Sequence, residues 1–172
     1  MKKTLIALME DRPGVLARVA NLIRRRNYNV VSLAVAPTET SSISRMTAVL
    51  ECEESEEEQV GKQLRKLINV TKVVTELTPE NAIFRELALL KVTATPSTRS
   101  EIIHLAEVFR AQVVDVSSQS LTIETTGTED KIDSLIELLK PFGLREIART
   151  GPMAMLRGSS NGYHAAGDGA GG

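Results

Sequence analysis

The chain has 172 residues, 42% hydrophobic and 25% charged, so it can bury a real core and is not expected to be disordered as a whole. Its 21 Lys and Arg residues nearly balance 22 Asp and Glu residues, and the net charge of −1 leaves no whole-chain positive field for nucleic acid or an anionic membrane. A single cysteine, Cys52, excludes an intrachain disulfide and a multi-cysteine metal site. No apolar run approaches the ~20 residues of a membrane span, and residues 4–9 are too short for a signal peptide. The sequence therefore predicts a cytoplasmic protein.

The first elements alternate between strand and helix patterns. Residues 5–9 form an apolar run typical of a buried strand. Pro13 is predicted at the first helical position, where its missing N–H is not needed. The apolar positions of this helix are Val15, Leu16, Val19, Leu22 and Ile23. Residues 24–26 are arginines and end the helix at the negative end of its dipole, and Asn27 is expected to adopt the left-handed C-cap conformation.

Two β-branched runs follow, at residues 30–35 and 43–50, and the polar loop between them predicts a hairpin. Ser55 and Glu58 have the spacing of a capping box that opens a second helix. Its apolar face consists of Val60, Leu64, Leu67 and Ile68. Residues 70–77 are a last strand, so the order β-α-β-β-α-β predicts a ferredoxin-like module.

The same order recurs after a joint at residues 78–81. Thr98 and Glu101 are predicted to cap the third helix, and Pro141 and Gly143 to end the fourth. The predicted strands are 87–94, 113–116, 121–125, 144–148 and 153–156. The expected fold is α+β, with two tandem ferredoxin-like βαββαβ modules over residues 1–78 and 79–157, the second an α/β sandwich. Residues 158–172, rich in Gly, Ala and Ser, are expected to be a disordered tail.

No constellation of catalytic residues is evident. His104 lies in a predicted helix and His164 in the tail, and neither has a sequence partner for metal binding or for activating a nucleophile. Cys52 at a strand end is interpreted as a small, semi-buried hydrophobic residue. A G-x-G-x-x-G string at residues 167–172 has no helix after it, so it is a coincidence and not a dinucleotide site.

Two charged runs have a functional and a structural interpretation. The acidic residues between 51 and 58 are either a cation site or the carboxylates that favour a helix start. The arginines at 24–26 are either a phosphate or nucleic-acid patch or the cations that favour a helix end. The structural interpretation is simpler in both cases, and the sequence predicts no catalysis and no metal site.

The turn at residues 10–16 joins the first strand to the first helix. The backbone N–H groups of Gly14, Val15 and Leu16 are predicted to be unpaired there, and such a helix start attracts a carboxylate. Gly14 lets a ligand approach the backbone, and Asp11 offers an acceptor for an ammonium group. This pairing suits a free amino acid, although a Pro-Gly turn in this place is more often only structural.

The segment 9–19, MEDRPGVLARV, resembles the signature of ACT domains, which are small β-α-β-β-α-β modules that bind amino acids at domain–domain interfaces. Further segments in both modules resemble the small regulatory subunit of acetohydroxyacid synthase (acetolactate synthase). These are 28–33, 35–38, 44–47, 62–70, 85–92, 109–111, 114–116 and 149–151. The resemblance extends over residues 3–157.

This resemblance implies a non-catalytic subunit without a cofactor of its own. In the family, a catalytic large subunit carries thiamine diphosphate, Mg²⁺ and FAD and condenses pyruvate with pyruvate or 2-oxobutyrate, on the way to valine, leucine and isoleucine. The small subunit raises that activity and confers feedback inhibition by valine, sometimes by other branched-chain amino acids. The alternative is a free-standing tandem-ACT sensor that acts on transcription or another enzyme, and the motifs of the second module argue against it.

The resemblance also implies a homodimer whose effector lies between two ACT domains. Carried onto this sequence, one wall of the site is Asp11, Gly14, Val15 and Leu16, and the other wall, from the second chain, is Asn29 and Val30. Asp11 stands where the family often has Asn. The carboxylate of Asp11 attracts the ammonium group of the effector but repels the effector's carboxylate. Asn27 stands where the family usually has Gly, and can still take a positive φ.

Overall fold

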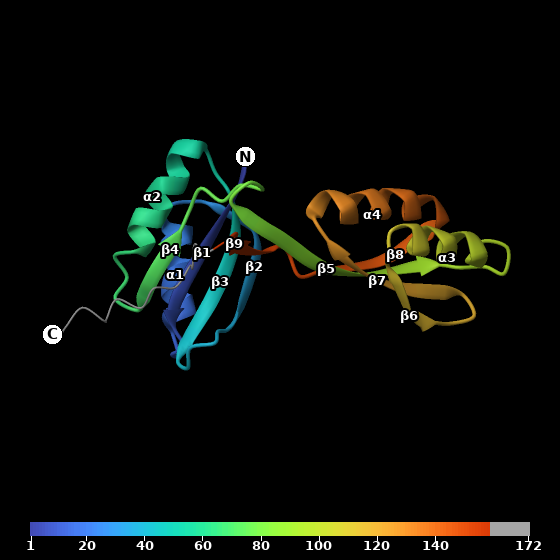
Figure 1. Ribbon diagram of the computed structural model, residues 1–172, viewed down its shortest axis with the longest axis horizontal. Helices are drawn as coiled ribbons and strands as arrows, with labels where there is room; N and C mark the ends of the chain where they lie inside the picture. The colour runs from blue at the N-terminus through green and yellow to red at the C-terminus, as the bar shows by residue number, and fades with distance from the viewer. Residues whose placement is uncertain (159–172) are drawn as a thin grey trace. The chain divides into compact units, whose positions relative to one another are not determined.

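The computed structural model describes residues 1–158, which fall into two compact units (Figure 1). Among the described residues, unit 1 comprises residues 1–83 and 154–158, and unit 2 is Phe84–Met153. The sequence prediction had assigned residues 79–157 to the second module. Apart from Gly158, the predicted tail lies outside the described residues.

Unit 1 has the predicted β-α-β-β-α-β order. Its elements are β1 (Lys2–Glu10), α1 (Val15–Arg25), β2 (Asn29–Pro37), β3 (Ile43–Glu51), α2 (Glu54–Leu64) and β4 (Val70–Val74). The strands form an antiparallel sheet in the order β2-β3-β1-β4, which is the ferredoxin-like arrangement. Asn27 has φ 60°, so the predicted left-handed conformation after α1 is confirmed.

The core of unit 1 lies between the sheet and the two helices. Alternate residues of β1 enter it, because successive side chains of a strand point to opposite faces. Val15, Val19 and Ile23 enter it from α1 at spacings of four residues, which place them on one helix face. Burying each of these side chains contributes about 1.5–3 kcal/mol. The strand residues of this core include Leu5, Ala7, Met9, Met46, Ala48 and Leu50.

The other face of this sheet is also covered near its middle. Ile6 and Leu8 are buried there, on the opposite side of β1 from the core residues. The Arg45 guanidinium of β3 donates a hydrogen bond to the carbonyl of Ala154, within unit 1. Burial lowers the pKa of Arg45 below its usual value. The segment at Ala154 is therefore attached to the first sheet.

Several local predictions were wrong in unit 1. Pro13 precedes the helix, and Gly14, with φ 85°, is its N-cap. The second helix is capped by Glu53 in place of Ser55: the Glu53 N–H donates to the Glu56 carboxylate at 2.8 Å. That helix ends at Leu64, since the following turns close through i to i+3 bonds, and Ile68 is 91% exposed.

Unit 2 repeats the topology of unit 1. Its elements are β5 (Ala82–Thr93), α3 (Arg99–Val108), β6 (Gln112–Val116), β7 (Ser120–Gly127), α4 (Glu129–Gly143) and β8 (Leu144–Arg149), and the last strand, β9 (Met153–Leu156), begins at the final residue of unit 2 and continues into unit 1. The antiparallel order is β6-β7-β5-β8, and β9 pairs with β5. Figure 1 shows α3 and α4 on one side of this sheet. Two tandem ferredoxin-like modules are thereby confirmed, although Pro141 lies inside α4 and does not end it.

Candidate amino-acid-binding site

The corner between β1 and α1 is held by backbone hydrogen bonds. The Asp11 N–H donates to the Ser42 carbonyl at 2.7 Å, and the Arg12 N–H donates to the Glu10 carbonyl at 3.0 Å. Gly14 follows with φ 85°, a conformation that costs most residues other than Gly, Asn and Asp about 1–2 kcal/mol. A Cβ at Gly14 would have no heavy atom within 4 Å beyond its chain neighbours, so the space over this glycine is open. The corner is a fixed turn with room for a ligand against its backbone.

The donors at this corner differ from the prediction in one respect. The Val15 N–H donates to the Arg12 carbonyl at 3.3 Å, so it is paired within the turn. The N–H groups of Gly14 and Leu16 have no hydrogen-bond partner among residues 1–158. The Gly14 and Leu16 donors therefore remain available at the start of α1, where the helix dipole also favours an anion.

The side chains at the corner divide between core and surface. Val15 is only 4% exposed and packs in the core of unit 1, whereas Leu16 is 40% exposed. Leu16 lies about 100° around the helix from Val15. Asp11 is exposed beside the turn. The corner thus offers a carboxylate, two amide donors and one apolar side chain to a ligand.

The other predicted wall, Asn29 and Val30, starts β2. The Asn29 amide donates to the Glu51 carboxylate at 3.1 Å, and Val30 is 41% exposed. Asn29 pairs in register with Glu51, and Glu51 with Lys2 at the start of β1. The corner lies instead beyond the far end of this nine-residue strand, so the walls are about 25 Å apart at ~3.3 Å per residue. One chain does not bring the six predicted residues together.

Strand β2 is the outermost strand of its sheet and carries an apolar strip that the sequence analysis missed. Val30, Leu33 and Val35 lie opposite Leu50, Ala48 and Met46 of the core, on the helix side of the sheet. A register shift between Val30 and Ser32 puts Val30 on this side together with Leu33. Each of the three is about 40% exposed. The apolar residues between 30 and 35, interrupted only by Ser32, were the available signal, and apart from Val30 they were interpreted only as a strand.

The remaining candidates from the sequence do not form a second site. His104 is exposed, with its Nδ1 4.0 Å from the Glu107 carboxylate. Burial raises the pKa of the Cys52 thiol. Residues 1–158 hold no group of three or more His, Cys, Asp or Glu side chains placed to bind a metal ion. No helix within the same range is long and apolar enough to span a bilayer.

Two family models match the chain, one on each unit. Residues 5–72 match a model described as "AHAS small subunit-like ACT domain", and residues 85–158 match "Small subunit of acetolactate synthase". The chain belongs to the acetolactate synthase small-subunit family. The ACT match contains the whole corner and both residues of the second wall. The first unit is accordingly an ACT domain, in agreement with the resemblance found in the sequence.

Relatives of this family match the chain over nearly all of their length. The acetolactate synthase small subunit of Mycolicibacterium smegmatis is 54% identical over 155 residues, which is 90% of this chain and 91% of the relative. That of Bacillus subtilis is 49% identical over 160 residues, 92% of each chain. The crystal structure of the small subunit from Thermotoga maritima superposes with a TM-score of 0.85 at 38% identity, over 92% of this chain and 99% of that one.

Proposed function

We propose that this chain is the non-catalytic regulatory subunit of an acetolactate synthase. In this proposal it binds a catalytic large subunit, raises the activity of that subunit, and confers feedback inhibition by valine or another branched-chain amino acid. Thiamine diphosphate, Mg²⁺ and FAD belong to the large subunit, and both chains act in the cytoplasm. The observation that carries the effector site is the open corner over Gly14, with two unpaired N–H donors beside an exposed carboxylate.

A homodimer joined along β2 accounts for the separation of the two walls. Strand β2 has one unpaired edge, and such an edge pairs readily with a second copy of itself. Around a two-fold axis the two β2 strands run antiparallel, so the partner's Asn29 lies beside the Pro37 end of this chain's β2. Pro37 pairs with Ser44, and Ser44 with Met9, which places this end next to the corner. A two-fold dimer thus assembles the complete site twice.

The groups of the assembled site match those of valine. Its carboxylate accepts hydrogen bonds from the Gly14 and Leu16 N–H groups, and its ammonium group pairs with Asp11 and with the side-chain oxygen of the partner's Asn29. The isopropyl group lies against Leu16 and the partner's Val30, both exposed in the single chain. One methylene changes binding in such an apolar site by only about 1–3 kcal/mol, so leucine and isoleucine are expected to bind as well.

Inhibition follows if valine favours one geometry of the dimer. Because the site has walls from two chains, binding stabilises the arrangement that brings them together. The large subunit is inhibited when its active state prefers another arrangement, with a coupling of about 1–3 kcal/mol, typical of allosteric proteins.

The test replaces the open glycine with a charged residue. Gly14→Asp is expected to abolish valine inhibition of the reconstituted enzyme while the activation of carboligation remains. Gly14→Asn is the matched control, since it has nearly the same size, tolerates a positive φ, and adds no charge. Carboligase activity is measured with the large subunit over a series of valine concentrations. Normal valine inhibition of Gly14→Asp would show that the pocket is elsewhere.

A further inference from the structure

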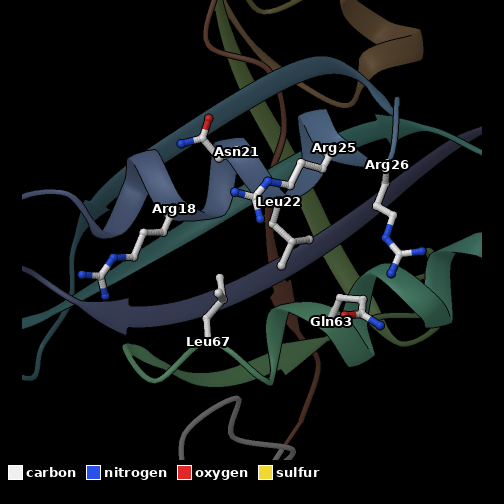
Figure 2. A pocket seen from close by; sticks show the side chains of 7 residues that line it. All are labelled: Arg18, Asn21, Leu22, Arg25, Arg26, Gln63 and Leu67. Carbon is white, nitrogen blue, oxygen red and sulfur yellow. The ribbon is translucent and has the colours of Figure 1, made fainter.

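A groove runs between α1 and α2 on the outer side of the helix layer of unit 1 (Figure 2). One hollow of about 340 Å³ is lined by Arg18, Arg25 and Arg26 of the first helical segment and by Gln63 and Leu67. A second hollow of about 220 Å³ shares Arg18 and Leu67 with the first. The shared residues make the two hollows parts of one elongated groove.

The edge of this groove is cationic. Arg18, Arg25, Arg26 and Lys66 line it, and no lining residue is acidic. Within residues 1–158, Arg25 and Arg26 form no ion pair, and Arg18 donates only to the Asn69 side chain, at 2.8 Å. Helix termination explains cations at the end of α1 but not Arg18 near its start or Lys66 beyond α2. Four cationic residues are thus gathered on a chain whose net charge is −1.

The groove is also apolar. Figure 2 shows Leu22 and Leu67 in the middle of the hollow, with Arg25 near Leu22 and with Arg18 and Arg26 toward opposite ends. Ile68 lines the second hollow and is 91% exposed, the most exposed large apolar side chain among the described residues. Leu67 lines both hollows, Leu22 the first and Ile68 the second, so the apolar side chains follow one another along the groove, and a contiguous apolar patch with a polar rim is typical of an interaction surface. Inorganic phosphate would leave these apolar side chains in water, whereas an acidic amphipathic peptide would cover them and pair with the arginines.

We propose that the groove docks an acidic amphipathic segment of the catalytic large subunit. Aspartate or glutamate side chains of that segment bind Arg18, Arg25 and Arg26, and its apolar side chains cover Leu67 and Ile68. The identity of the partner rests on the proposed function, while the chemistry of the segment rests on the groove. At about 100° per residue, Arg18 and Arg25 lie on the opposite flank of α1 from Leu16. Docking here therefore leaves the effector wall uncovered.

The experiment removes two of the four positive charges of the groove in the full-length chain. The large subunit is titrated with wild type, with Arg25→Gln/Arg26→Gln, and with Ile68→Ser, and carboligase activity is recorded at several salt concentrations. The double variant is expected to need about tenfold more protein for half-maximal activation, with the maximum unchanged and a weaker salt dependence. Ile68→Ser is expected to shift the midpoint about threefold. The matched control, Lys140→Gln/Arg145→Gln, removes two exposed charges from unit 2 and should titrate as wild type.

Each outcome bears on the proposal once circular dichroism shows that the variants are folded. An unchanged midpoint for Arg25→Gln/Arg26→Gln overturns it, even if tripolyphosphate binds the groove of the wild type. If the wild type itself fails to activate the large subunit, the regulatory function is refuted, and direct binding of the two chains is then measured by sedimentation. If the wild type binds the large subunit and the double variant does not, the groove is supported as the docking site. If the wild type does not bind, or if both bind equally well, the docking proposal is overturned.

Discussion

Leu33→Lys is expected to break the proposed β2–β2 dimer and with it the proposed effector site. Leu33 lies near the middle of β2, where a two-fold axis between antiparallel β2 strands would pass. A lysine there removes an apolar contact and brings two like charges close together across the axis. Lysine on an exposed edge strand also opposes edge-to-edge pairing directly.

The magnitude follows from the exposure of this side chain. Leu33 is 40% exposed in the single chain, and full burial of a leucine contributes about 1.5–3 kcal/mol, so covering the exposed part contributes about 1 kcal/mol. Each of the two protomers carries the substitution, so the free energy of dimerisation falls by about 2 kcal/mol before charge repulsion is added. This corresponds to a rise of about 30-fold in the dimer dissociation constant.

The assay is sedimentation velocity over a range of protein concentrations, combined with calorimetric titration of valine. Leu33→Lys should be largely monomeric where wild type is dimeric, and should lose valine binding, because the two walls then separate. Val108→Lys is the matched control: Val108 is 63% exposed, ends α3, and lies in unit 2. A dimer of unchanged strength in Leu33→Lys would refute β2 pairing as the source of the site.

Two further predictions concern buried ionisable groups of unit 1. Glu57 is 5% exposed, 3.4 Å from the Lys3 ammonium, and accepts the Glu76 N–H at 2.7 Å, so Glu57→Ala should lower the free energy of unfolding by about 1–3 kcal/mol. Urea denaturation measures this loss, and Glu57→Gln, which keeps an acceptor, should lose less; equal losses would contradict the assigned role of the hydrogen bond. Cys52 is 6% exposed and burial raises its pKa, so Ellman's reagent should react with it only on unfolding. As pH rises, the thiol of the unfolded chain ionises before the buried thiol of the folded protein, so this group should lower the free energy of unfolding above its ordinary pKa. Rapid labelling of the native protein would contradict the burial of Cys52.

The topology was predictable because hydrophobic periodicity is written directly in the sequence. Val15, Val19 and Ile23 recur at helical spacing and enter the core as expected. Gly14 and Asp11 could also be placed at a strand-to-helix corner, since the pattern changes period there. The same reasoning found both units, because the order of periods repeats.

Finer features depend on contacts that periodicity does not carry. The choice of Glu53 over Ser55 as the helix cap follows from which residue meets the Glu56 carboxylate. The pairing of the Val15 N–H with Arg12 depends on the left-handed turn at Gly14. The irregular register after Val30 arises from pairing with β3, and a regular alternation predicts the wrong set of residues on the helix side.

Helix α1 takes part in both proposed interactions, the binding of the effector and the docking of the large subunit, and it uses a different flank for each. At 3.6 residues per turn, the core face of Val15, Val19 and Ile23 leaves a flank on either side. Helix α1 connects β1 to β2, and α2 connects β3 to β4, in a sheet of the order β2-β3-β1-β4. The flank of α1 that carries Leu16 therefore faces β2. The flank that carries Arg18 and Arg25 faces α2. An effector bound at the start of α1 and a partner docked along it would both contact the same rigid element. In the proposed complex, a change in dimer geometry caused by valine would therefore move the docking groove with it, and this movement would be a direct mechanical route from effector to enzyme.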